Sequence, residues 1–330
     1  MVLTAGWSAR QGLITAAGVV LALLVALRLG LDDPWWAALS AWVVANQDRH
    51  SLWSKAAQRA LGTALGLGLG LVLAAATAGI PTLLLLALFA VGAAGARGRF
   101  ASAHGYAWLY AGVTATMVLM QAASTPVGLL AFAQWRMIEI TVGVLAATLI
   151  GTMFAVEPAA HPAGTPHPPS ALGRLTLAGG MLPVLVLLVW QALDLPAVVQ
   201  MAATSMVLLD RDVGSVQVRA RQRLFGCLLG GVCGLAVVLG LDLATLPLWL
   251  ATIGGGLFLF SILHQGGGPS AYVGTQAGVA WVMTMVSGRG PPALLLPVLD
   301  RLMGITLGVC LILVVAALVA PARPACEPAT

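Results

Sequence analysis

The sequence predicts an all-α membrane protein of about twelve transmembrane helices in two parallel six-helix repeats. Of its 330 residues, 60% are hydrophobic and only 8% are charged, and the mean hydropathy is +0.97. An ordinary globular domain is about a quarter charged. Apolar runs long enough for spanning helices recur along the chain, and several motifs of the first half return in the second half. These three observations predict the fold class.

The apolar runs are bounded by proline, glycine or charged residues, and they give the elements in order. A spanning helix needs about 20 mainly apolar residues, so twelve of them leave no room for a soluble ATPase, Rossmann or nucleic-acid-binding domain. No enzyme activity, cofactor or metal site is predicted, since no phosphate-binding loop and no cluster of Cys and His is present. The predicted spans are 11–30, 34–47, 58–79, 81–96, 104–122, 136–156, 174–193, 196–209, 222–240, 245–263, 270–287 and 302–320.

The spans divide the chain into a first membrane repeat, 1–156, and a second membrane repeat, 174–330. A linker, 157–173, joins them and is rich in proline, histidine and small residues, which cannot sustain a helix. Twelve of the sixteen basic residues fall on one side of the predicted membrane, two on the other and two at span edges. By the positive-inside rule, both termini and the linker are cytoplasmic, in the inner membrane of a bacterium.

The two halves carry matching motifs at nearly constant offsets. Arg59 and the three glycines that follow it at four-residue spacing match Arg223 and its own three glycines, at an offset of 164 residues. Tyr106 and Arg136 match Tyr272 and Arg301 at offsets of 166 and 165. Because each half has an even number of predicted spans, the halves have the same orientation and an axis along the membrane normal relates them.

The duplicated arginines are the first candidate site residues. Arg59 and Arg223 each follow another cation, Lys55 and Arg219, at four-residue spacing, so an anion is expected near each pair. That anion is either lipid phosphate at the cytoplasmic surface or a carboxylate substrate. Helix packing is the simplest role of the glycines, and a pivot between the third and ninth spans is the alternative.

A second pair of arginines, Arg136 and Arg301, lies on the side with few basic residues. Each has a carboxylate close in sequence, Glu139 and Asp300 respectively. One interpretation is an anchor at the membrane interface. The other is a pair of cationic sites along a passage, with these carboxylates as proton acceptors. Gly304 stands at the position equivalent to Glu139, so that proton site occurs once.

Tyr106 and Tyr272 supply hydroxyl groups and aromatic surface in the fifth and eleventh predicted spans. Aromatic walls with a few hydrogen-bond donors suit a passage for an aromatic acid. Aromatic residues near span ends also form interfacial belts, which is the alternative.

The sequence resembles the fusaric acid resistance (FUSC) family, which is related to the aromatic acid exporters. The resemblance is carried by Trp35 and Trp36, by the polar turn 47–51, and by Lys55 with the stripe Arg59-x-x-Gly-Thr-x-x-Gly; 212–226 looks like the same module again. It implies a proton-driven inner-membrane efflux protein for aromatic or other weak organic acids, in some cases with a periplasmic adaptor. Members similar to the aromatic acid exporters commonly carry a cytoplasmic domain between the halves, where this chain has only the linker.

The leading hypothesis is a secondary exporter of small organic anions, with a passage between the halves near Arg136, Arg301, Tyr106 and Tyr272. A passive organic-anion channel and a non-transporting scaffold subunit of the membrane are the alternatives. The expected partners are the substrate and the lipid bilayer, without nucleic acid; a homo-oligomer is left open.

Overall fold

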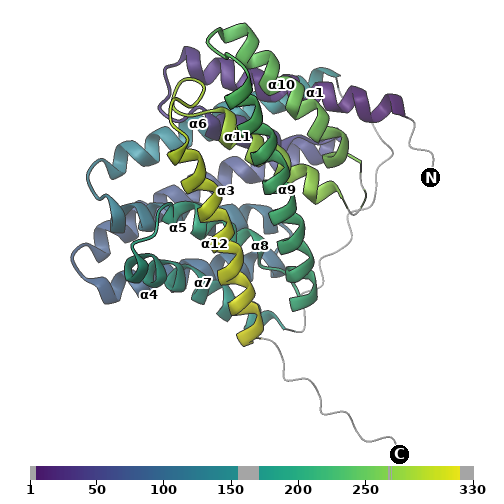
Figure 1. The fold of residues 1–330 in the computed structure, drawn as a ribbon. Helices are drawn as coiled ribbons and strands as arrows, with labels where there is room; N and C mark the ends of the chain where they lie inside the picture. The colour runs from purple at the N-terminus through teal and green to yellow at the C-terminus, as the bar shows by residue number, and fades with distance from the viewer. Residues whose placement is uncertain (1–4, 155–170, 267, 269, 320–330) are drawn as a thin grey trace, which may run out of the picture.

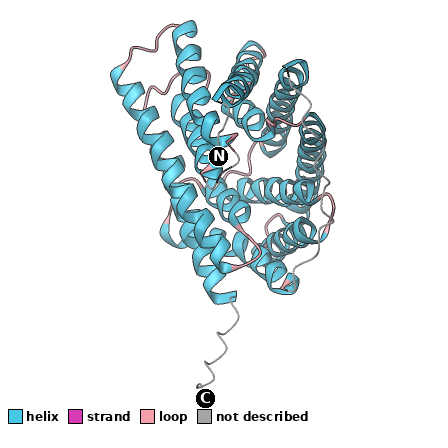
Figure 2. Cartoon of the chain, turned by 90° about the vertical axis from the view of Figure 1, so that its right-hand side faces the viewer, coloured by secondary structure: helices cyan, strands magenta, loops and turns pink. Residues whose placement is uncertain are grey.

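The computed structural model describes residues 5–154, 171–266, 268 and 270–319. The described residues form twelve helices and no strand, apart from an isolated bridge between Ser287 and Gly290 (Figure 1, Figure 2). The helices are α1 (Ala5–Arg28), α2 (Trp35–Val44), α3 (Arg49–Thr77), α4 (Pro81–Ala101), α5 (Gly105–Ser124), α6 (Leu129–Phe154), α7 (Leu172–Leu193), α8 (Val198–Leu208), α9 (Val213–Gly240), α10 (Leu246–His264), α11 (Ala271–Met285) and α12 (Leu296–Val319). Most of the predicted linker lies outside the described residues.

Eight of the helices are long and apolar enough to cross a membrane, which makes the chain a multi-pass membrane protein. These are α1, α3, α4, α6, α7, α9, α10 and α12. The short helices α2 and α8 have 10 and 11 residues, and at 1.5 Å per residue they reach only about 15 Å of a hydrocarbon core of about 30 Å. Extended residues follow both of them, Ala45 after α2 and Leu209 after α8, so each short helix continues as a non-helical segment.

Five helices, α1, α3, α6, α9 and α12, begin six to nine residues earlier than the sequence predicts. Helices α6 and α12 start at Leu129 and Leu296, so Arg136 and Arg301 lie inside helices and not at span edges. Helices α3 and α9 start at Arg49 and Val213. Charged residues were expected to end the spans, but these helices continue through them, and Arg59, Arg136 and Arg223 are buried within protein.

Aspartates fix the starts of α3 and α9. The Asp48 carboxylate accepts hydrogen bonds from the backbone N–H and the hydroxyl of Ser51, and Asp212 accepts from the backbone N–H of Ser215 at 2.8 Å. These bonds favour the charged carboxylate, so the pKa of each aspartate lies below its ordinary value. Each cap sets the register of a helix whose eleventh residue is a buried arginine, Arg59 or Arg223.

Nearly every contact between helices of the first half has a counterpart six helices later. Within the halves, α3 packs on α5 as α9 packs on α11, and α2 packs on α6 as α8 packs on α12. Between the halves, α1 meets α10 and α4 meets α7. In Figure 1 these two pairs lie at opposite ends of the molecule, α1 with α10 at the top and α4 with α7 at the bottom. The helices with matching sequence motifs therefore occupy matching places.

The glycine stripes serve packing within each half. A Cβ added at Gly66 would overlap the carbonyl oxygen of Ala111 on α5, and one added at Gly230 would overlap that of Ala277 on α11. The stripes therefore allow close approach of α3 to α5 and of α9 to α11. The alternative of a pivot formed by α3 against α9 is wrong, because each stripe faces a helix of its own half.

The packing predicts opposite outcomes for two glycines of α3. Gly66→Ala would drive its Cβ into Ala111 and Thr114, and we expect it to lower the free energy of unfolding by about 1–3 kcal/mol or more. Gly68→Ala is the matched control, because an added Cβ there meets nothing within 4 Å and alanine favours the helix by roughly 1 kcal/mol. Thermal unfolding in detergent measures both. Equal unfolding temperatures for the two variants would contradict this packing.

Candidate functional site

A cavity of about 210 Å³ lies where the two halves face each other. Residues from α2, α3, α5 and α6 of the first half and from α8, α9 and α11 of the second half line it. Most of the lining is apolar. Its polar and aromatic members are Trp36, Arg59, Tyr110, Thr114, Arg223, Tyr272, Thr275 and Gln276. Among the described residues, no acidic side chain lines this cavity.

Arg59 and Arg223 are the two charged residues in this lining. Their exposed fractions are only 5% and 8%. Each lies ten positions beyond the start of its helix, α3 or α9, which is about 15 Å along the helix axis. Both side chains are buried and line the cavity, which favours a role inside the protein over contact with lipid headgroups.

The two guanidinium groups have few partners. Arg59 lies 3.6 Å from the centroid of the Tyr110 ring, a cation–π contact. Arg223 donates from Nη2 to the hydroxyl of Thr204 at 3.1 Å. Nε and Nη1 of Arg59 and Nε of Arg223 have no hydrogen-bond partner within the described part of the chain. No ion pair between described residues includes either arginine.

Such burial is costly. Removing an ion from water carries a penalty of about several kcal/mol even after the protein relaxes, and it is offset only where opposite charge and hydrogen bonds are supplied. The ring of Tyr110 and the Thr204 hydroxyl supply a part of that compensation. An anion in the cavity would supply the rest. Buried ionisable groups in membrane helices commonly mark the route of a substrate or an ion.

Of the two tyrosines predicted as site residues, Tyr272 lines the cavity and Tyr106 does not. Tyr272 lines the cavity, and the guanidinium of Arg219 lies 6.0 Å from its ring centroid. Tyr106 does not line it; its ring packs edge-on against Tyr110, with centroids 4.7 Å apart. The sequence analysis did not select Tyr110 as a site residue. Its position one helical turn after Tyr106 was the signal that could have identified it.

Arg136, unlike Arg59, forms two ion pairs, although its Nε has no hydrogen-bond partner among the described residues. Its guanidinium lies 2.9 Å from Asp33 Oδ2 and 2.8 Å from Glu139 Oε2. The backbone N–H of Asp33 donates to Glu139 Oε1 at 2.8 Å. Arg136 is 4% exposed and Glu139 is 0% exposed. The sequence spacing predicted the pair with Glu139, but it gave no sign of Asp33, which reaches the cluster from the loop before α2.

Arg301 does not mirror Arg136. Its Nη1 donates to the carbonyl oxygens of Met283 and Val286, both at 3.0 Å, at the end of α11. Asp300, its neighbour in sequence, is partly exposed, and among the described residues neither forms an ion pair. Arg301 therefore caps a helix C-terminus, where backbone carbonyl groups lack helical partners. Neither Arg136 nor Arg301 lines the cavity.

Two tryptophans connect these arginines to the cavity. Arg301 lies over the ring of Trp35, and Arg136 lies over the ring of Trp36, each 4.8 Å from the ring centroid. The two rings are 4.3 Å apart. Trp36 also lines the cavity. Arg136 therefore contacts the cavity wall through Trp36, and Arg301 is connected to that wall only through Trp35.

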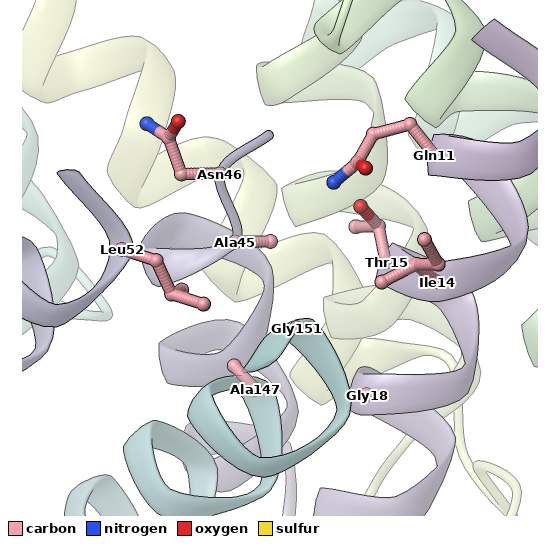
Figure 3. A pocket seen from close by; sticks show the side chains of 9 residues that line it. All are labelled: Gln11, Ile14, Thr15, Gly18, Ala45, Asn46, Leu52, Ala147 and Gly151. Atoms are coloured by element: carbon pink, nitrogen blue, oxygen red, sulfur yellow. The ribbon is translucent and has the colours of Figure 1, made fainter. Parts of the chain in front are cut away.

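A smaller pocket lies between α1, α6 and the segment that follows α2 (Figure 3). Figure 3 shows Gln11 and Thr15 of α1 opposite Ala45 and Asn46. Its volume is about 10 Å³, which suffices for about one water molecule. It is too small for an organic substrate. Among the described residues, no group of His, Cys, Asp and Glu could hold a metal ion.

The geometry predicts how the Arg136 cluster contributes to stability. Arg136→Leu leaves the buried Glu139 without its cation, and we expect a loss of about 3–5 kcal/mol in the free energy of unfolding. The double variant Arg136→Leu/Glu139→Leu removes both charges and should recover most of that loss. Thermal unfolding in detergent measures both variants. If the double variant is less stable than Arg136→Leu, the cost of the single variant does not come from leaving the Glu139 carboxylate without a cation.

Comparison with protein families gives two matches, which together account for most of the chain. Residues 9–164 match the model described as the fusaric acid resistance protein family, and residues 184–315 match the model described as fusaric acid resistance protein-like. Comparisons with curated proteins and with solved structures give no match. The two matched regions contain both buried arginines of the cavity, Arg59 and Arg223. The resemblance seen in the sequence is thus confirmed: the chain belongs to the fusaric acid resistance family of transport-related membrane proteins.

Proposed function

We propose that this protein is a secondary exporter of aromatic and other weak organic acids, and that the central cavity is its substrate site. The observation that carries the proposal is the pair of buried arginines, Arg59 and Arg223, in a cavity without acidic lining. A carboxylic acid of ordinary pKa is ionised at neutral pH. Its carboxylate would form charge-assisted hydrogen bonds with these guanidinium groups, which are stronger than neutral ones.

The cavity walls suit an aromatic body. Trp36, Tyr110 and Tyr272 offer ring surfaces, and Gln276 and Thr275 offer hydrogen-bonding groups. Aromatic rings pack favourably in offset or edge-on geometry. A volume of about 210 Å³ is below the roughly 300–1,000 Å³ of pockets for drug-sized ligands, so the proposed substrate is small.

The halves supply a mechanism for alternating access. We infer two parallel six-helix repeats related by an axis along the membrane normal, which the matched helix contacts support. Rocking of the repeats at the α1–α10 and α4–α7 contacts would expose the cavity to each side in turn. The basic residues at the starts of α3 and α9 and at the end of α4 support cytoplasmic termini in the inner membrane of a bacterium.

Glu139 is the proposed proton acceptor. It is fully buried, it pairs with Arg136, and Arg136 contacts Trp36 in the cavity wall. Protonation would weaken the hold of Glu139 on Arg136, and Trp36 would transmit that change to the cavity. Asp300, the second carboxylate of the sequence prediction, is partly exposed and has no such connection to the cavity. A coupling role for Asp300 has less support.

Removal of both cavity cations should abolish transport without unfolding the protein. For Arg59→Gln/Arg223→Gln in proteoliposomes, we expect export of labelled aromatic acids to fall at least about a hundredfold. The unfolding temperature should be equal or higher, since two buried charges with few partners are gone. The matched control is Arg97→Gln/Arg221→Gln, which removes two exposed arginines. Undiminished export by the cavity variant would refute the assignment of the site.

Coupling is tested on Glu139. Glu139→Gln keeps the shape but cannot exchange a proton, so we expect transport driven by a pH gradient to be lost while equilibrium binding of the acid persists. Asp242→Asn, an exposed carboxylate in the loop between α9 and α10, is the control. If wild-type vesicles instead show an anion current that does not depend on the pH gradient, the protein is a channel. Loss of binding together with transport would show that Glu139 supports the fold and not the coupling.

A further inference from the structure

The charges of the cavity lining do not balance. Two guanidinium groups, those of Arg59 and Arg223, line it, and among the described residues no carboxylate does. The cavity lining therefore carries a formal charge of +2 from its two guanidinium groups.

The acidic residues near the cavity form ion pairs with other arginines. Glu139 and Asp33 both pair with Arg136, and Asp210 pairs with Arg219 at 2.6 Å. None of the three lines the cavity. The counter-charge for Arg59 and Arg223 must therefore come from what the cavity binds.

The two cations come from opposite halves. Arg59 belongs to α3 and Arg223 to α9, at matching positions, and both reach the same cavity of about 210 Å³. A ligand with a single negative charge would neutralise one guanidinium and leave the other buried without an anion. A ligand with two anionic groups on one body would neutralise both, and would hold the two halves together through one molecule.

The surroundings of the two arginines also set the shape of such a ligand. The ring of Tyr110 lies against Arg59 on one side, and Trp36 and Tyr272 are further ring surfaces in the lining. A flat apolar body with an anionic group at each of two separated positions fits this arrangement. The volume allows a body of about one aromatic ring.

We propose that the cavity selects a small dianion, such as a dicarboxylate on a single ring, with one anionic group on Arg59 and the other on Arg223. The inference rests on the proposed function, since it names the substrate class of the same site. It makes the preferred substrate doubly charged, where a weak organic acid in general needs only one charge.

The test compares two ligands that share a ring and one carboxylate and differ in charge. Terephthalate and its monomethyl ester share one ring and differ by one negative charge at pH 7. Binding to the purified full chain in nanodiscs is measured by isothermal titration calorimetry. We expect terephthalate to bind one molecule per chain, about a hundredfold more tightly than the monoester. Equal or tighter binding of the monoester would overturn the inference and leave the proposed function standing.

Single variants locate the two charges. In Arg59→Gln and in Arg223→Gln, we expect the preference for terephthalate over the monoester to disappear, because one cation remains. Arg221→Gln, an exposed arginine two positions before Arg223, should keep the full preference. A preference that survives in either cavity variant would overturn the two-point attachment, as would two monoester molecules bound per wild-type chain. If neither ligand nor benzoate binds at all, the proposed function itself fails.

Discussion

The central constraint on this protein is the burial of two guanidinium charges, those of Arg59 and Arg223, in an apolar helical bundle whose described residues offer them no ion-pair partner. The aspartate caps of α3 and α9 set the register of the helices that carry Arg59 and Arg223. The glycine stripes let α3 and α9 pack tightly against α5 and α11, and α5 and α11 each supply a tyrosine to the cavity lining, Tyr110 and Tyr272. The same helices that give the bundle its packing thus hold the two cations at the meeting of the halves.

The four buried or partly buried arginines that match between the halves divide into two kinds. Arg136 has two carboxylates and Arg301 has two backbone carbonyls, so their charges are compensated by the protein. Arg59 and Arg223 have a ring and a hydroxyl, which compensate a guanidinium only in part. Compensated charges stabilise one arrangement of helices, whereas partly compensated charges favour a bound anion. This difference separates the structural arginines from those of the candidate site.

The halves have matching helix contacts, but they carry different side chains at two matching positions near the cavity. Glu139 has no counterpart, because Gly304 stands at the matching position and a Cβ there would lie 2.9 Å from the Cβ of Ala197. The close approach of α12 to α8 leaves no room for a carboxylate. Gln276 of α11 occupies the place of Tyr110 on α5; Arg59 has the ring of Tyr110 beside it, whereas Arg223 donates to the hydroxyl of Thr204. Matching helix contacts thus surround a cavity with unlike neighbours for its two arginines, and the cluster of Arg136, Glu139 and Asp33 lies outside its lining.

Much of this protein follows from its sequence alone, because hydrophobic runs, helix caps and repeated motifs are local patterns. They determined the helical membrane class, the order of twelve helices, the pairing of Arg136 with Glu139 and the selection of Arg59, Arg223 and Tyr272 as site residues. Only the tertiary structure decided that Arg59 and Arg223 share one cavity, that Tyr106 and Arg301 lie behind it, and that Asp33 completes the Arg136 cluster. Those facts depend on contacts between helices far apart in the chain, and local spacing carries no information about which side chains meet across a bundle.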